Sequence, residues 1–305
     1  MGVDISVIFD LRNILSPDRV LRDVLLKDHT TFKTGGPAGA FVLVENNDEL
    51  ARAVAFLKNR EIPFFVLGNG SNLLVSDSGF DGAVIKLSGS FNELSVSDNV
   101  ITAGAGVLLS KVCLLAEESG LSGLEFAYGI PGTLGGATVM NAGAYDGEMS
   151  YVVSEVTVLD GEGIVRTLSC EDMHFGYRDS IIKHSPMIVL SAKMTLEPGD
   201  RAEIHDKMAD FLQRRKSKQP LEFPSAGSTF KRPVGYFAGK LIEDAGLKGK
   251  RIGGACVSEK HAGFIVNTGG ATASDINMLM ETVEEEVYQR FGVKLEPEVI
   301  KLGKF

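Results

Sequence analysis

The hydrophobic positions of the chain repeat with two different periods, and each period predicts one type of secondary structure. Apolar residues at helical spacing predict helices at residues 11–26, from Asn47, from Ser110 to Gly120, at 202–216 and from the capping box Thr272–Asp275. Short apolar or alternating runs predict strands at residues 40–44, 64–67, 83–87, 94–96, 100–103, 155–159, 164–168, 187–196 and 293–300. The chain is therefore a mixture of helices and strands.

Two features of the pattern predict how these elements are connected. Asp160-Gly161 separates two strand runs, and this dipeptide is typical of a hairpin turn. At Glu197–Asp200 the alternating pattern gives way to a strongly charged helix, so we expect a domain boundary near residue 200.

Two glycine-rich stretches interrupt the regular pattern. Residues 128–145 carry no charge and contain Gly129, Gly132, Gly135, Gly136 and Gly143. Residues 67–74, with the sequence LGNGSNLL, follow the apolar run 62–66 and predict a loop at the end of a buried strand. Glycines permit positive φ angles and close approach of backbone N–H groups, which can together bind an anion. Two such loops could hold one long phosphorylated cofactor.

The glycine stretches match neither of the common nucleotide-binding motifs. Leu73 stands where the dinucleotide fingerprint requires a third glycine, and the chain contains no phosphate-binding loop of the G-x-x-x-x-G-K-[ST] type. A single glycine-rich loop is as often an ordinary tight turn as a ligand site. Two loops with interleaved Asn and Ser favour a dinucleotide held without a Rossmann unit.

Composition narrows the class of protein. The chain has 305 residues, 44% hydrophobic and 23% charged, as in soluble globular proteins of two or three domains. A net charge of −9 argues against a general nucleic-acid binder, which needs a basic face.

The three cysteines and the N-terminal sequence give expectations about the cellular setting. Cys113, Cys170 and Cys256 are too scattered for a metal site or a disulfide framework, so no metal is expected. No apolar run approaches the ~18 residues of a membrane span, and Asp4 lies where a leader peptide would be basic. We expect a cytoplasmic protein, whose oligomeric state the sequence leaves open, a monomer included.

The two glycine-rich stretches, GNGSNLLV and GIPGTLGGATVMNAGAY, resemble the flavin-binding core of the UDP-N-acetylenolpyruvoylglucosamine reductase family. Further segments similar to that family occur in the same order along most of the chain, at residues 29–36, 175–180, 226–233, 237–246, 260–267 and 295–299. The segments fit the shorter subtype of the family, which lacks an inserted tyrosine loop over the substrate.

The resemblance implies a fold and a reaction. The fold would be α+β, with a two-part FAD-binding region of the vanillyl-alcohol-oxidase type at residues 1–90 and 91–200. A smaller α+β substrate domain would follow at 201–305, with the C-terminal strand returning to the active site. NADPH would reduce noncovalent FAD, which would reduce the enolpyruvyl group of the UDP-sugar substrate to UDP-N-acetylmuramate in peptidoglycan precursor synthesis.

Three residues are candidates for the catalytic steps. Arg178 offers a planar donor fork that suits a carboxylate or a developing enolate. Ser228 follows Gly227, which allows close approach of a ligand, and the resemblance implies that its hydroxyl protonates the enolic intermediate. Glu298 shares a strand face with Glu296, and the resemblance implies that it acts with the arginine on the enol.

The remaining candidates divide between cofactor and substrate. The glycine stretches supply the cofactor-binding candidates Gly68, Asn69, Gly70, Ser71, Asn72, Gly132, Thr133, Gly135, Gly136, Asn141, Ala142 and Gly143. The substrate or NADPH would meet Tyr177, Lys231, Arg232, Lys240 and His261. A valine at Gly70 or Gly136 is expected to weaken flavin retention more than folding, because a branched side chain blocks close approach.

Two other functions remain open at this point. Another FAD oxidoreductase of the same broad fold, such as an alcohol oxidase, would keep both glycine loops without needing Arg178, Ser228 and Glu298. A flavin- or nucleotide-binding protein without turnover would also fit the glycine loops and the acidic charge.

Overall fold

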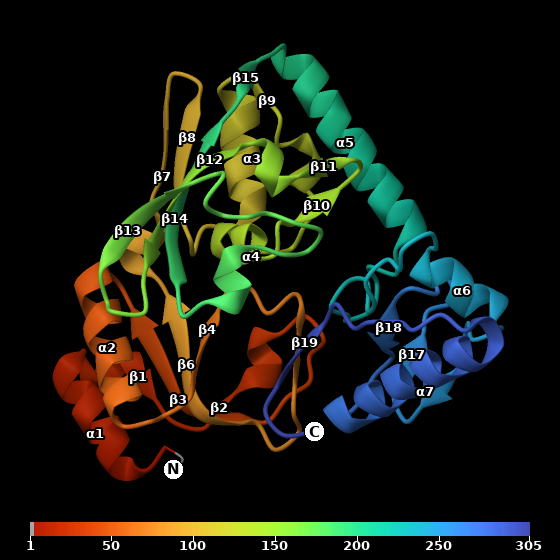
Figure 1. Ribbon diagram of the computed structural model, residues 1–305, viewed down its shortest axis with the longest axis horizontal. Helices are drawn as coiled ribbons and strands as arrows, with labels where there is room; N and C mark the ends of the chain where they lie inside the picture. The colour runs from red at the N-terminus through yellow and green to blue at the C-terminus, as the bar shows by residue number, and fades with distance from the viewer. Residues whose placement is uncertain (1–2) are drawn as a thin grey trace. The chain divides into compact units, whose positions relative to one another are not determined.

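The computed structural model of the chain describes residues 3–305 (Figure 1). It divides into two compact units, each built from separate stretches of the sequence. Unit 1 comprises the described part of Met1–Arg22 together with Ala40–Asn69 and Gly82–Arg214. Unit 2 comprises Asp23–Gly39, Gly70–Asp81 and Arg215–Phe305. The three-part division expected from the sequence stays a prediction.

Unit 1 contains a first sheet with strand order β1-β3-β6-β4. Its strands are β1 (Val20–Leu21), β3 (Pro37–Val44), β4 (Phe64–Leu67) and β6 (Phe80–Leu87), and β4 and β6 are parallel. Alternate residues of β3 and β6, such as Val42 and Ile85, are buried with apolar residues of α1 (Ile5–Ile14) and α2 (Asn47–Asn59). The two helices therefore cover one face of this sheet (Figure 1).

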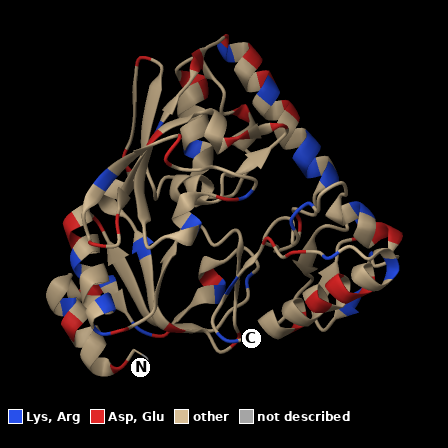
Figure 2. Cartoon of the chain, viewed as in Figure 1, with Lys and Arg blue, Asp and Glu red and all other residues tan. Residues whose placement is uncertain are grey.

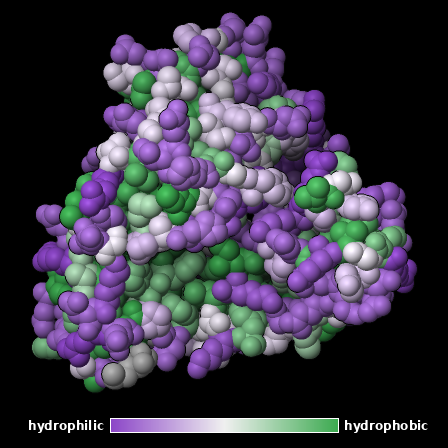
Figure 3. Space-filling view, viewed as in Figure 1, coloured by the Kyte–Doolittle hydropathy of each residue, from purple (hydrophilic) through white to green (hydrophobic). Residues whose placement is uncertain are grey.

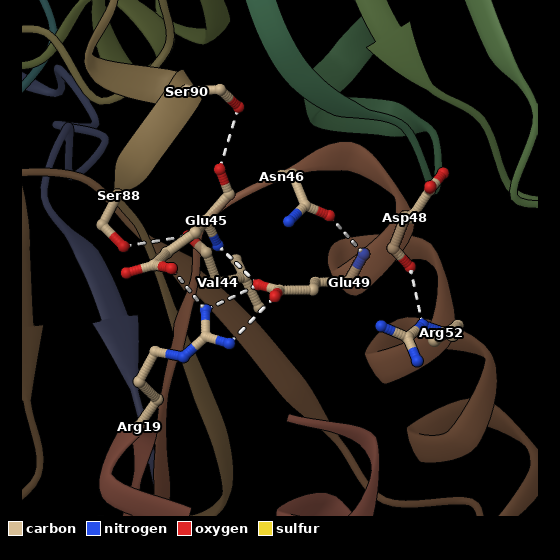
Figure 4. Close-up of polar contacts among 9 residues, drawn as sticks. All are labelled: Arg19, Val44, Glu45, Asn46, Asp48, Glu49, Arg52, Ser88 and Ser90. Atoms are coloured by element: carbon tan, nitrogen blue, oxygen red, sulfur yellow. Dashed lines mark hydrogen bonds and ion pairs between the residues drawn. The ribbon is translucent and has the colours of Figure 1, made fainter. Parts of the chain in front are cut away.

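An ion-pair network joins the N-terminal turn of α2 to the sheet (Figure 4). Arg19 contacts Glu49 through two hydrogen bonds of 2.8 and 2.9 Å, and it also lies 2.9 Å from Glu45. The Asn46 side chain accepts a hydrogen bond from the Glu49 amide and caps the helix. The bond from Arg19 lowers the pKa of the Glu49 carboxyl. The two-pronged contact between the Arg19 guanidinium and the Glu49 carboxylate therefore helps to fix where α2 begins.

A second, antiparallel sheet of unit 1 has the order β13-β12-β14-β8-β7. These strands are β7 (Leu94–Ser97), β8 (Val100–Gly104), β12 (Val153–Leu159), β13 (Val165–Ser169) and β14 (Ile188–Thr195). Helices α3 (Leu109–Glu118) and α4 (Leu134–Val139) contact β8, and the short strands β9 (Leu121–Ser122) and β15 (Glu197–Pro198) pair with each other. Helix α5 (Arg201–Lys218) follows, where the Asp200 carboxylate accepts hydrogen bonds from the amides of its first turn.

Unit 2 packs two helices with a small antiparallel sheet. Helix α7 (Ala273–Phe291) contacts α6 (Ala238–Asp244) and the strands β16 (Arg251–Ile252), β17 (Ala255–Val257) and β18 (Ile265–Asn267). The predicted capping box is confirmed, and Gly292 ends α7 in the left-handed region with φ of 66°. In the same unit β2 (Val24–Leu25) pairs with β3, and β5 (Leu73–Val75) runs parallel to β19 (Ile300–Leu302).

The structure differs from the sequence-based expectations in the extent of three local elements. Of the helices predicted at residues 11–26, α1 ends at Ile14 and a short 3₁₀ helix follows at Pro17–Arg19, but residues 20–21 and 24–25 instead pair with β3. The predicted hairpin at Asp160-Gly161 is confirmed, but its loop extends over residues 160–164, because the Asp160 carboxylate accepts hydrogen bonds from the amides of Glu162 and Ile164. The strand predicted at 293–300 is confined to β19, apart from a single bridge at Pro297.

Charged residues occur throughout the chain (Figure 2). The last turn of α5 is basic, with Arg215, Lys216 and Lys218, which suits the negative end of a helix dipole. Much of the face seen in Figure 3 is hydrophilic. Within residues 3–305, no helix combines the length and apolar character needed to cross a membrane.

The N-terminus of α7 generates a prediction about stability. Asp77 accepts hydrogen bonds from the amides of Ala273 and Ser274, at 2.7 and 2.9 Å, and from the Ser274 hydroxyl. Burial opposes ionisation of Asp77, but these bonds outweigh it and lower its pKa from 3.8. We expect Asp77→Ala to reduce the free energy of unfolding by about 1–2 kcal/mol at neutral pH, as for other lost helix caps.

The same pKa shift fixes the direction of the pH dependence. Because the folded-state pKa lies below the unfolded value, the stabilisation is present above pH 3.8 and is lost as the pH falls through the folded-state pKa. Urea unfolding of wild type and Asp77→Ala at neutral and acidic pH measures it. Asp206→Ala, which changes an exposed aspartate on α5, is the control. A gap between wild type and Asp77→Ala that stays constant into acid would contradict the assignment.

Candidate functional site

The two glycine-rich stretches meet in unit 1. The Asn69 side chain donates a hydrogen bond of 2.7 Å to the carbonyl of Pro131. A Cβ atom on Gly68 would lie 2.8 Å from the Thr133 hydroxyl, so a larger residue at this position would displace the Thr133 side chain. Thr133 is the N-cap of α4 and accepts from the Gly136 amide. Gly68 and Asn69 of the first stretch thus lie against the start of α4 in the second stretch.

The central glycines achieve this contact without the backbone conformation expected from the sequence. Gly129, Gly132, Gly135, Gly136 and Gly143 do not use the positive φ that glycine permits. In the central stretch and its turn, positive φ occurs instead at Asn141, Tyr145 and Asp146. A Cβ on Gly135 would lie 2.8 Å from that of Ala105, so close packing explains this glycine.

Gly136 differs from its neighbours because nothing in the protein requires a glycine there. It is exposed in the first turn of α4, and an added Cβ would meet only the Thr133 hydroxyl, at an ordinary 3.7 Å. Two residues further on, the hydroxyl of Thr138 is buried and has no hydrogen-bond partner within the described chain. An open glycine and an unsatisfied buried hydroxyl on the same short helix are features that a bound ligand would explain.

Asn141 connects the central stretch to the segments beside it. This buried residue has φ of 41°, and its side-chain nitrogen donates to Glu148 and to the carbonyl of Gly176, each at 3.0 Å. Its side-chain oxygen accepts from the Ser150 amide at 2.9 Å. The amide therefore holds three segments together, including the short hairpin of β10 (Gly143–Ala144) and β11 (Gly147–Glu148).

Arg178 lies in a tight turn that is fixed to the central stretch. Gly176 and Asp179 pair across the turn, and Arg178 has φ of 55°, a conformation that glycine or asparagine usually fills at this position. Its guanidinium donates a 2.8 Å hydrogen bond to the carbonyl of Gly143. The guanidinium carbon also lies 5.1 Å from the centre of the Tyr177 ring. Asp179 contacts His184 and Lys183.

The other two catalytic candidates belong to unit 2, where their backbones are neighbours. Thr229 is buried, and its carbonyl accepts from the Glu298 amide at 2.8 Å. Thr229 also donates from its amide to Gly263 and accepts from the Ile265 amide through its hydroxyl. This residue thus fixes the exposed Ser228 beside the segment that carries Glu298.

The first glycine loop continues into unit 2 and contacts the C-terminal segment there. The Asn72 side chain donates to the carbonyl of Glu298 at 3.0 Å, and the Asn72 carbonyl accepts from the Ile300 amide at 3.0 Å. Gly70 has φ of 62°, and its carbonyl accepts from the Thr31 amide. Ser71, between them, is half-buried.

The predicted substrate-binding residues of unit 2 have different surroundings. Lys231 pairs with Glu296 at 3.2 Å, and Lys240 pairs with Asp244 on its own helix. Arg232 stacks on the ring of Phe237, with 3.9 Å between the guanidinium carbon and the ring centre. His261 accepts from the Gly263 amide through Nδ1, and burial lowers the pKa of its imidazole.

One residue beneath the first glycine loop was missed from the sequence. Lys86, in β6, donates a hydrogen bond to the carbonyl of Gly68. The sequence does contain a signal for this residue, because a lysine interrupts the otherwise apolar run Ala83–Leu87 of a predicted strand. Across the described residues, no cluster of His, Cys, Asp and Glu could hold a metal ion.

Comparison with known proteins matches both parts of the chain. Residues 38–169 match the FAD binding domain family, and residues 219–302 match the C-terminal domain of UDP-N-acetylenolpyruvoylglucosamine reductase. The reductase of that name from Caldanaerobacter subterraneus subsp. tengcongensis is 52% identical over 96% of this chain and 97% of its own. The one from Clostridioides difficile is 48% identical over 98% of each chain.

Solved structures agree with these matches. The UDP-N-acetylenolpyruvylglucosamine reductase of Thermus caldophilus is 41% identical, with a TM-score of 0.81 over 93% of this chain and 99% of that one. A variant of Phl p 4, a glucose oxidase, is 14% identical and has a TM-score of 0.50 over 64% of this chain and 44% of its own, which shows only a related fold. The expected α+β class with a two-part flavin-binding region is confirmed.

The three hydrogen bonds of Asn141 lead to a prediction. Asn141→Ala removes all three and leaves an alanine at positive φ, so we expect the free energy of unfolding to fall by roughly 2–4 kcal/mol. Chemical denaturation measures this loss. Asn99→Ala is the matched control, because that side chain donates one hydrogen bond, to Leu196. Equal losses for the two variants would show that Asn141 does not hold the stretch.

Proposed function

The chain belongs to the UDP-N-acetylenolpyruvoylglucosamine reductase family, and we propose that it uses NADPH and FAD to reduce the enolpyruvyl group of the UDP-sugar substrate. The match over 96% of the chain at 52% identity is the observation that carries this proposal. The product would be UDP-N-acetylmuramate, a peptidoglycan precursor. We propose that the enzyme acts in the cytoplasm, with the UDP-sugar and NADPH as its small-molecule partners.

The glycine-rich stretches fit FAD as the resident cofactor. Gly136 leaves open space at the start of α4, and the Thr138 hydroxyl lacks a partner in the described chain. Gly68 and Asn69 lie against this region, so the two stretches together would form the pocket for a phosphorylated ligand. The amides of Gly135 and Gly136 already donate to the Ala105 carbonyl and the Thr133 hydroxyl. Asn141 would hold the stretch in position, and Ala142 and Gly143 continue it. When bound, FAD supplies the hydride chemistry.

Arg178 is our candidate for stabilising the charge that develops on the substrate. Its guanidinium is already oriented by the Gly143 carbonyl, and its turn is held by Asn141 and by the bond from Ser180 to Val139. A preoriented cation loses little freedom when charge develops, which is where electrostatic catalysis gains most. The unfavourable φ of 55° supports this role, because a turn alone would favour glycine.

Ser228 and Glu298 are our candidates for the protonation step. Ser228 is exposed after Gly227, which has φ of 77° and no neighbour that an added Cβ would meet. Glu298 lies on the adjoining segment, while Glu296 pairs with Lys231. In the proposed role, the Ser228 hydroxyl donates the proton to the intermediate and Glu298 acts with Arg178 on the enol.

Replacement of Gly136 tests where the flavin binds. In Gly136→Val the new Cβ meets no crowded atom of the protein, so folding should be nearly unaffected. A side chain projecting into the cofactor would cost about 1–3 kcal/mol, or roughly 5–150-fold in FAD affinity. Titration of the flavin-free protein with FAD measures this loss, and urea unfolding measures stability. Unchanged FAD affinity in a folded variant would contradict the assignment.

Gly70→Val does not offer the same test, contrary to the expectation from the sequence. Gly70 has φ of 62°, and an added Cβ would lie 2.2 Å from the carbonyl oxygen of His29. Backbone atoms cannot move away as the tip of a side chain can. We therefore expect this variant to lose folding as well as flavin, which makes it the contrasting control for Gly136→Val.

Ser228→Ala tests the chemistry apart from binding. Neither FAD binding nor reduction by NADPH uses the Ser228 proton, so both should remain near wild type. General acid catalysis contributes ~10²–10⁴-fold, so oxidation of the reduced enzyme by the enolpyruvyl substrate should slow by about that factor. Stopped-flow absorbance separates the two half-reactions, and Ser228→Cys should recover part of the rate. A wild-type rate of reoxidation with product formed would assign the proton to another group.

A further inference from the structure

Lys86 occupies an unusual position in the first sheet of unit 1. Neighbouring residues of β6, Ala83, Ile85 and Leu87, are buried in the core with α1 and α2. Side chains alternate across a strand, so Lys86 points to the opposite face. It pairs with Leu67 in the parallel ladder, at the point where β4 ends and the first glycine loop begins.

The positive charge of Lys86 has no negative partner in the described chain. Across residues 3–305 no carboxylate oxygen lies within 4.0 Å of its ammonium, and its one hydrogen bond goes to the carbonyl of Gly68. Burial lowers the pKa of Lys86, and no nearby acid opposes this effect. A partly buried lysine usually has an acidic partner, because desolvation of an ammonium is costly.

The position of Gly68 indicates what could supply the missing charge. Gly68 lies against Thr133, and the next residue, Asn69, is hydrogen-bonded to Pro131. The Gly68 carbonyl, which accepts the hydrogen bond from Lys86, is therefore at the point where the two glycine-rich stretches meet. An ammonium has three N–H donors, and the described chain uses one of them.

We propose that Lys86 is a positioning residue of the flavin site, which holds the Gly68 carbonyl and supplies the countercharge for the pyrophosphate of FAD. The inference rests on the proposed function, because it requires FAD at the glycine-rich stretches. The pyrophosphate is the anionic part of oxidised FAD, whereas its ring system is neutral. Backbone amides of the loop carry dipoles but no net charge, so they cannot neutralise the pyrophosphate. The ammonium of a lysine at the base of the loop supplies the positive charge that balances it.

Flavins with and without phosphate test this role. The full-length protein is stripped of flavin and titrated with FAD, FMN and riboflavin, and binding is followed by quenching of flavin fluorescence. For Lys86→Met we expect FAD affinity to fall by roughly 10–100-fold, as for a lost charged hydrogen bond. Riboflavin, which has no phosphate, should change less than about threefold. Lys86→Arg should retain most of the FAD affinity.

Two further variants separate charge from structure. Lys86→Gln keeps a donor for the Gly68 carbonyl but removes the charge, so it should lose FAD affinity as Lys86→Met does. Lys58→Met is the matched control, because Lys58 also donates to a backbone carbonyl, that of Gly161, at 2.7 Å but elsewhere in unit 1. It should bind all three flavins like the wild type.

Several results would overturn the proposal while leaving the flavoprotein assignment intact. Equal losses of FAD and riboflavin in Lys86→Met, with recovery in Lys86→Gln, would show that the lysine only holds the loop. Unchanged FAD affinity with a shifted flavin reduction potential would place the ammonium at the ring system. Failure of the wild-type protein to bind any flavin would instead refute the proposed function.

Discussion

The buried side chain of Asn141 provides the interaction on which the glycine-rich stretch depends. Because this stretch contains five glycines, only some of its residues, such as Leu134 and Ala137, hold it by packing, and hydrogen bonds supply much of the rest. Asn141 supplies three of them, and they reach Glu148, Ser150 and Gly176. Asparagine tolerates positive φ better than most residues, which suits the observed 41°. One side chain thus fixes both the proposed cofactor turn and the turn that carries Arg178.

Around Ser228 and Glu298, backbone hydrogen bonds hold the chain in place, as the Asn141 side chain does for the glycine-rich stretch. The segments that carry them are joined through Thr229, whose carbonyl, amide and hydroxyl are all used. Asn72 connects the Glu298 segment to the first glycine loop in the same way. Backbone hydrogen bonds therefore fix the segments that carry the two candidates.

The sequence predicted elements whose signals are local and missed those set by distant partners. Helices α2 and α7 were predictable, because their caps and apolar faces lie within the helices themselves. The apolar spacing of residues 20–25 looks helical, but residues 20–21 and 24–25 pair with β3, and this long-range pairing decides their structure. At Gly135 the sequence showed the need for glycine but not its cause, which is the close approach of Ala105.

The candidate site was predictable where motifs resemble a family and not where a residue breaks its local rule. Arg178 has a backbone conformation better suited to glycine, and Lys86 places an unpaired charge in an apolar strand. Each of these two features costs stability. Arg178 contacts Gly143 and Lys86 contacts Gly68, and both glycines belong to the glycine-rich stretches. Local rules are most often broken at functional sites. The two exceptions therefore favour the same region as the ligand site, by an argument that uses no family resemblance.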